Sequence, residues 1–102
     1  MIASLEIAPD ELRIVKEILG RCLPPGTRVF AFGSRATGVR LKPWSDLDLA
    51  VQTIAPLDPG TLAALADEFD EAPIDWKVDV LDLATVNADF RRIIEPDLQE
   101  LI

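Results

Sequence analysis

Two short stretches of the chain combine residue types that could hold a nucleoside triphosphate and its metal ions. The first is Gly33-Ser34, which directly follows the apolar run 28–32. A glycine lets a phosphate approach the backbone, and Ser34 can cap a helical turn whose free N–H groups favour an anion. The second is Asp46 and Asp48, separated by one residue, which strand alternation places on one face. Two carboxylates on one rigid edge could bind a divalent cation.

A third aspartate, Asp79, lies on a later segment with the alternation of a half-buried strand. Residues 74–81 place apolar side chains on one face and charged side chains, including Asp79, on the other. Each piece alone is weak evidence, because short acidic pairs arise by chance in a chain with 18 acidic residues. Their order and spacing together favour a catalytic metal site formed by Asp46, Asp48 and Asp79. No basic residue nearby is an evident ion-pair partner for these three.

The elements that must position these residues follow from apolar periodicity and from the proline and glycine positions. Helices are predicted over 9–22, 58–72 and 87–94, and strands over 28–32, 47–53 and 74–81. The first strand is apolar on both faces, which predicts a central place in a sheet. The last helix is expected to turn Phe90, Ile93 and Ile94 inward. The apolar residues at the carboxyl end, Leu98, Leu101 and Ile102, either close the core or offer a surface to a partner.

Composition limits the class of protein. The 102 residues suffice for one domain, 1–102, with a single core. The chain has no histidine, which excludes Ser-His-Asp triads and the commonest zinc sites, and its single cysteine excludes an internal disulfide. No stretch approaches the roughly 18 uninterrupted apolar residues of a membrane span, and the amino terminus lacks the features of a signal peptide. We therefore expect a cytoplasmic protein without a membrane partner.

The charge distribution is uneven. A net charge of −8 argues against a nucleic acid backbone as the main partner. Residues 18–45 nevertheless contain no acidic residue and include five basic ones: Arg21, Arg28, Arg35, Arg40 and Lys42. This window predicts either a positive patch suited to a triphosphate or a solvated surface loop. Trp44, in the same window, could stack on a base or pack against the protein.

Three motifs together resemble those of the minimal nucleotidyltransferases of the DNA polymerase β superfamily. They are Phe32 to Gly38, Ser45 to Val51 and Val78 to Val80. The motifs span residues 32–80, and the similarity in length and element order covers nearly the whole chain. The resemblance implies an α/β (α+β) fold, in which helices pack against a mixed β-sheet, as in the polymerase β-like nucleotidyltransferase fold.

The resemblance also implies roles for individual residues. Gly33 and Ser34 would contact the triphosphate, and Asp46, Asp48 and Asp79 would hold two magnesium ions. Asp79 would complete the site on the acceptor side, by helping to bind the metal ion that activates the nucleophile or by taking its proton. Arg35 is assigned to the nucleotide-binding residues as well, and any of Arg35, Arg40 and Lys42 could neutralise charge in the transition state.

Many small proteins that resemble this chain are antitoxins paired with a HEPN-domain ribonuclease toxin, and some transfer AMP from ATP to a toxin tyrosine. The resemblance thus implies a magnesium-dependent protein adenylyltransferase that uses ATP, needs no nucleic acid template and acts as a type VII-like antitoxin on a HEPN toxin. One alternative is an antitoxin that neutralises the toxin by complex formation alone. Another is a small-molecule nucleotidyltransferase, although such enzymes usually carry an additional helical domain.

Overall fold

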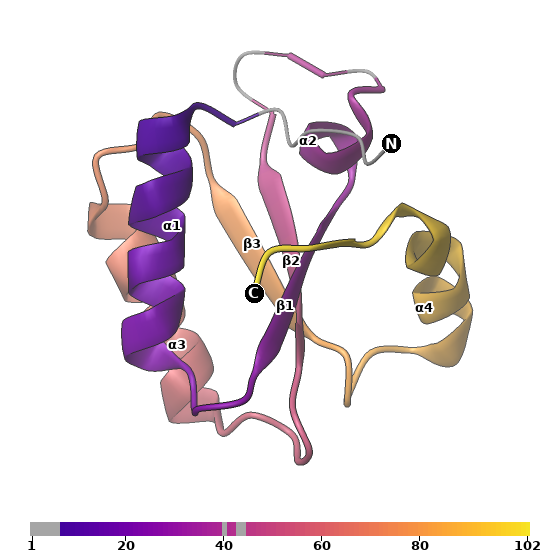
Figure 1. Cartoon of the computed structure of the whole chain (residues 1–102). Helices are drawn as coiled ribbons and strands as arrows, with labels where there is room; N and C mark the ends of the chain where they lie inside the picture. Colours follow the sequence, from indigo (N-terminus) through magenta and orange to yellow (C-terminus); the bar gives the residue numbers. More distant parts are fainter. Residues whose placement is uncertain (1–6, 40, 43–44) are drawn as a thin grey trace.

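A four-stranded mixed sheet with helices on both faces forms the framework of the molecule (Figure 1). The computed structural model describes residues 7–39, 41–42 and 45–102. In chain order the elements are α1 (Pro9–Cys22), β1 (Arg28–Phe32), α2 (Ser34–Thr37), β2 (Leu47–Gln52), α3 (Pro59–Glu71), β3 (Val78–Asp82), α4 (Ala88–Ile94), a 3₁₀ turn (Glu95–Asp97) and β4 (Gln99–Glu100). The α/β (α+β) class with a mixed sheet, predicted from the sequence, is confirmed.

The two long helices form where their local signals predict. Pro9 occupies the first turn of α1, where a missing N–H costs no hydrogen bond. Asp58 caps α3, because its Oδ1 accepts hydrogen bonds from the N–H groups of Gly60 at 2.6 Å and Thr61 at 3.3 Å. The two helices lie side by side (Figure 1), and an ion pair of 2.9 Å between Arg21 and Glu68 joins them.

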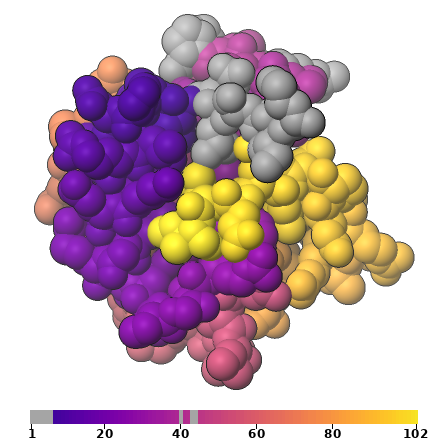
Figure 2. All heavy atoms as spheres, viewed as in Figure 1, coloured from indigo at the N-terminus to yellow at the C-terminus, as the bar shows by residue number. Residues whose placement is uncertain are grey.

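The sheet has the order β3-β2-β1-β4, so β1 is interior, as its apolar faces predict. β1 runs antiparallel to β2 and to β4, whereas β2 and β3 are parallel. The predicted strand 74–81 is wrong in its first half, because regular strand structure covers only Val78–Asp82. The short strand β4 was not predicted. Figure 2 shows the carboxyl-terminal segment lying on the surface next to α1, and Leu101 N–H donates to Val29 O at 2.7 Å.

The sheet separates two apolar clusters. Helices α1 and α3 cover the larger one, which includes residues from alternate positions of β1 and β2: Val29, Ala31, Leu47, Leu49 and Val51. On the opposite face, Phe32 and Ala50 pack with Leu83 and Ile94. Leu98 and Leu101 pack against these clusters and help to close the core, whereas Ile102, the third residue of that prediction, is 45% exposed.

Helix α4 differs from its predicted orientation. Ile94 is buried as expected, but Phe90 is 40% exposed and Ile93 is 70% exposed. A helix of seven residues touches the sheet along one narrow stripe, so neighbouring apolar positions stay in solvent. None of the helices in the described part of the chain has the length and apolarity that a membrane span requires.

Candidate active site

The turn between β1 and α2 depends on Gly33. Its backbone has φ 76° and ψ −161°, a region that essentially only glycine occupies. A Cβ atom built on Gly33 would lie 2.5 Å from Oδ2 of Asp48, closer than real Cβ contacts come. The residue type therefore lets the turn pack directly onto the Asp48 carboxylate. This contact joins the two stretches that the sequence singled out.

The role of Ser34 in the turn differs from the prediction. Gly33, not Ser34, is the N-cap of α2, and Ser34 is the first helical residue. The first N–H groups of a helix have no partner within the helix, so the start of α2 is the kind of turn whose backbone can bind an anion. A hydrogen bond from the carboxyl-terminal segment stabilises α2, because Gln99 Nε2 donates to Ala36 O at 3.1 Å. The backbone of α2 is thus fixed to the edge strand β4.

The three aspartates lie at one end of the sheet, on the face that carries α4. Asp48 and Asp79 are direct neighbours across β2 and β3, and Phe32 is the partner of Asp48 on β1. Asp46 lies just before β2 and is exposed. Burial raises the pKa of Asp48 above its usual value, and the charges of Asp79 and then Asp46 raise it further. The three carboxylates therefore share one electrostatic environment.

Two features of this acidic group differ from the expectation. Lys77 Nζ lies 3.4 Å from Asp79 Oδ1, so Asp79 does have a basic partner, on the segment that leads into β3. Among the residues that the structure describes, no group of three or more acidic, cysteine or histidine side chains is gathered closely enough to hold a metal ion. The described carboxylates are therefore neighbours, but they do not form a preformed metal-binding site.

Arg35 occupies a different environment from that expected of a phosphate-binding side chain. It is only 6% exposed, and its Nε donates to the backbone oxygen of Ser45 at 2.7 Å. Its guanidinium lies over the ring of Trp76, 4.5 Å from the ring centre. The side chain is held inside the protein by these contacts, whereas the sequence window predicted a loop cation.

The predicted positive patch is also smaller than the window of basic residues indicates. Arg21 pairs with Glu68, and Arg28 forms a two-pronged pair with Glu100 at 2.8 and 3.0 Å. Arg28 opens β1, so the length of the strand separates it from Gly33. The predicted roles of Arg40 and Trp44 fall on residues outside the described part of the chain.

Comparison with known proteins identifies the family. Residues 12–101 match the family model described as a nucleotidyltransferase domain. Over 92 residues the chain is 48% identical to the probable protein adenylyltransferase MntA of Haemophilus influenzae, a match that covers 90% of this chain and 79% of that protein. The chain belongs to the nucleotidyltransferase domain family.

Solved structures agree with the fold of this nucleotidyltransferase domain. One is a crystal structure of a toxin–antitoxin with AMP-PNP, with a TM-score of 0.73 and 24% identity, covering 89% of this chain and 72% of the other. Another contains a tri-AMPylated Shewanella oneidensis HEPN toxin in complex with an MNT antitoxin, with a TM-score of 0.65 and 21% identity, covering 89% of this chain and 68% of the other.

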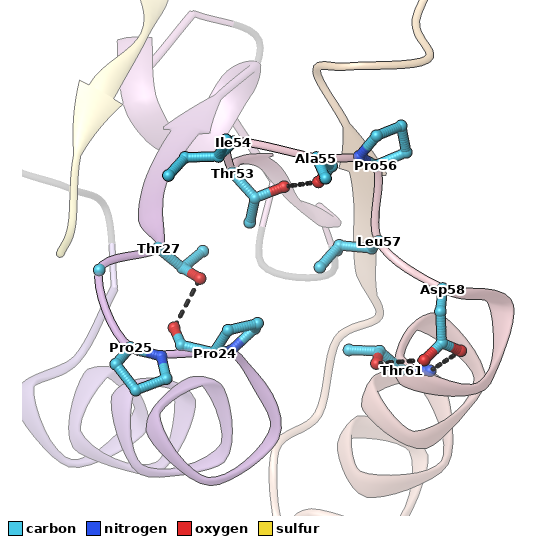
Figure 3. A pocket seen from close by; sticks show the side chains of 11 residues that line it. Pro24, Pro25, Thr27, Thr53, Ile54, Ala55, Pro56, Leu57, Asp58 and Thr61 are labelled. Atoms are coloured by element: carbon cyan, nitrogen blue, oxygen red, sulfur yellow. Dashed lines mark hydrogen bonds between the residues drawn. The ribbon is translucent and has the colours of Figure 1, made fainter.

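Figure 3 shows a groove of the nucleotidyltransferase domain that none of the three aspartates lines. It measures about 430 Å³ and is formed by the turn 24–27, the segment 53–58 and Thr61. These segments adjoin the start of β1 and the end of β2, opposite to the end that carries Gly33 and Asp48. This groove is therefore separate from the candidate active site, which lies at the other end of the sheet.

The sequence did not indicate three contributors to the site. Trp76 was one of several apolar strand residues, and the backbone carbonyl of Ser45 carries no side-chain signal. Lys77 was recognised only as part of a charged face. A pairing of Arg35 with Trp76 depends on contacts between segments far apart in the chain, so neither composition nor periodicity could have found it.

Proposed function

We propose that this nucleotidyltransferase domain transfers AMP from ATP to a tyrosine hydroxyl of a partner protein, a HEPN-domain toxin, and thereby acts as an antitoxin. The observation that carries the proposal is the close approach of the Asp48 carboxylate, a neighbour of Asp79, to the Gly33 turn, whose backbone we propose binds a phosphate. The name of the Haemophilus relative and the AMPylated toxin in the Shewanella complex support the same reaction.

The turn supplies the binding site for the triphosphate. Because Gly33 has no side chain, a phosphate can come close to its backbone at the start of α2. The Ser34 hydroxyl is half-buried at the same turn and can donate to a phosphate oxygen. The fixed backbone of α2 lets these donors act without first being ordered.

Asp46 and Asp48 are proposed to hold magnesium, with Asp79 completing the site. Carboxylate oxygens are the donors that Mg²⁺ prefers, and the ion usually takes only one or two of them together with substrate phosphates. An open group of carboxylates beside a phosphate-binding turn fits that requirement better than a closed cage would. Bound magnesium would neutralise the triphosphate and stabilise the leaving pyrophosphate. The pKa of Asp48 is raised first by burial and then by repulsion from Asp79 and Asp46, and a bound cation would relieve that repulsion.

Asp79 is proposed to act toward the acceptor. Asp79 lies on β3, an edge strand of the sheet, and is exposed, so a hydroxyl group of a partner protein can reach it. Its carboxylate can accept the hydrogen bond of that hydroxyl and orient the oxygen toward the α-phosphate. Lys77, 3.4 Å away, stabilises the negative charge that this role requires.

The test is an incubation of the purified chain with ATP, Mg²⁺ and the cognate HEPN-domain protein, followed by intact-mass spectrometry of that protein. One or more AMP additions are expected, and Asp46→Asn or Asp48→Asn should abolish them. Asp79→Asn should reduce transfer more than it reduces ATP affinity measured by calorimetry. Asp67→Asn is the matched control, because Asp67 lies exposed on α3, behind the opposite face of the sheet.

Two results would contradict the proposal. Transfer that persists in Asp48→Asn would move the chemistry to other residues. A HEPN-domain protein that keeps its mass but is inhibited by stoichiometric complex formation would favour an antitoxin that acts by binding alone.

A further inference from the structure

Arg35 and Asp82 are the two charged residues that are buried within the described part of the chain. The carboxylate of Asp82 accepts hydrogen bonds from the N–H groups of Leu57 at 2.8 Å and Ala84 at 2.9 Å, away from the Gly33 turn. Arg35 reaches from α2 to Ser45 and Trp76, which lie next to the predicted site residues. A buried guanidinium is costly unless its partners are well placed, so these contacts call for a function.

The contacts of Arg35 link the three segments that carry the site. Its own helix, α2, begins at the phosphate-binding turn. Its Nε bonds to the carbonyl of Ser45, the residue before Asp46, at 2.7 Å. Its guanidinium stacks on Trp76, which precedes β3 and Asp79, with 4.5 Å between the guanidinium carbon and the ring centre.

A backbone contact closes this arrangement. The N–H of Leu47, which lies between Asp46 and Asp48 in the chain, donates to the carbonyl of Lys77 at 2.8 Å. The lead-ins to β2 and β3 are therefore joined to each other as well as to Arg35. Asp46 lies outside the regular pairing of the sheet, so its position depends on such contacts more than that of Asp48 does.

We propose that Arg35 is a positioning residue, which fixes the spacing between the phosphate-binding turn and the three aspartates. The inference rests on the proposed transfer of AMP, and it replaces direct phosphate binding as the role of this side chain. An arginine is required because its planar group can stack on Trp76 while its Nε donates in the plane to Ser45. A lysine keeps the charge but cannot make both contacts at once.

The test compares Arg35→Lys with wild type in the AMP-transfer assay. We expect kcat to fall by about 10- to 100-fold, as misplacement of reacting groups by about 1 Å does. The Kd for ATP, measured by calorimetry, should change by less than about threefold. Arg21→Lys is the matched control, since Arg21 forms an exposed ion pair with Glu68 at the far end of α1, and it should leave both constants unchanged.

Trp76→Phe provides a second variant, in which Arg35 itself is unchanged. It weakens the stacking surface and should lower kcat in the same way, and its effect should not add to that of Arg35→Lys, because both break one contact. If either variant instead raised the Kd for ATP and left kcat intact, Arg35 would be a nucleotide ligand and the positioning role would be refuted.

A readout without ATP separates this proposal from the proposed function. In the nucleotide-free protein, Arg35→Lys should shift the amide NMR signals of Gly33, Asp46 and Lys77 and leave those of α3 unchanged. A wild-type chain that binds ATP but transfers no AMP would refute the function, and these shifts would still decide the role of Arg35. Unchanged signals at all three amides would refute the positioning role of Arg35.

Discussion

Replacing Gly33 by alanine should damage stability and nucleotide binding together. The backbone of Gly33 lies in a region that costs other residues about 1–3 kcal/mol. The new methyl group would also lie 2.5 Å from Asp48 Oδ2, so the carboxylate would have to leave its position. Forcing a half-buried side chain off its rotamer adds on the order of 1 kcal/mol.

The expected loss in free energy of unfolding for Gly33→Ala is therefore about 2–4 kcal/mol. At about 4–8 °C per kcal/mol for a domain of this size, Tm should fall by roughly 8–32 °C in a calorimetric or circular dichroism melt. ATP affinity should fall as well, because the displaced Asp48 and the added methyl group both disturb the turn. A fold stabilised by roughly 5–15 kcal/mol can survive this change.

Two other glycines separate the causes. Gly26 has φ 82°, and no atom lies within 4 Å of the position that a Cβ would take, so Gly26→Ala tests backbone strain alone and should cost about 1–2 kcal/mol. Gly20 lies in α1 with an ordinary φ and open space, so Gly20→Ala should stabilise by about 0.5–1 kcal/mol.

The contact itself can be tested in an Asp48→Ala background, where Gly33→Ala should cost only its backbone strain of about 1–3 kcal/mol. The reasoning is refuted if Gly33→Ala in the wild-type chain is as mild as Gly26→Ala and leaves ATP affinity intact. That result would mean that the turn does not press on the carboxylate.

Three further outcomes are expected. The pKa of Asp48 is raised in the folded state, so its contribution to stability is present below the ordinary pKa of 3.8 and is lost as pH rises through the folded-state pKa. Asp48→Asn should therefore raise Tm near neutral pH and not in acid. Mg²⁺ with ATP should stabilise the wild type by about 2.7 kcal/mol at a hundredfold excess of ligand over Kd, and so raise its Tm. The Tm of Asp46→Asn should not rise. Asp58→Ala should cost about 1 kcal/mol in a urea titration through loss of the α3 cap and leave ATP affinity unchanged.

Local signals in the sequence were sufficient for α1, β1, β2 and α3. Each has a complete apolar pattern and a proline, glycine or aspartate at its boundary. The strand predicted over 74–81 shows the limit of such patterns. Its alternation continues back to Ile74, but β2 begins at Leu47, whose partner is Val78, so residues before Val78 have no strand beside them. The length of β3 is set by its neighbour β2, and the periodicity of residues 74–81 carries no information about that neighbour.

The same limit applies to β4 and to α4. Two residues of β4 pair with Phe30 and Ala31, about 70 positions earlier, and no periodic signal exists in so short a segment. The orientation of α4 depends on which of its apolar residues reaches the sheet, and Ile94 does so where Ile93 does not. The aspartates and the glycine turn could be named from sequence because their chemistry depends on residue type and short spacing.

The basic residues could not be placed in this way, and their placement changes the electrostatics of the site. The window 18–45 predicted either a positive patch around the turn or a solvated loop, and in the structure Arg21 and Arg28 form ion pairs elsewhere and Arg35 lies inside the protein. These three arginines therefore offer a triphosphate at Gly33 less charge to compensate the carboxylates of Asp48 and Asp79 than the composition suggested. That deficit is a physical reason to expect the nucleotide to bind together with magnesium, since the cation can bridge phosphate and carboxylate oxygens that would otherwise repel.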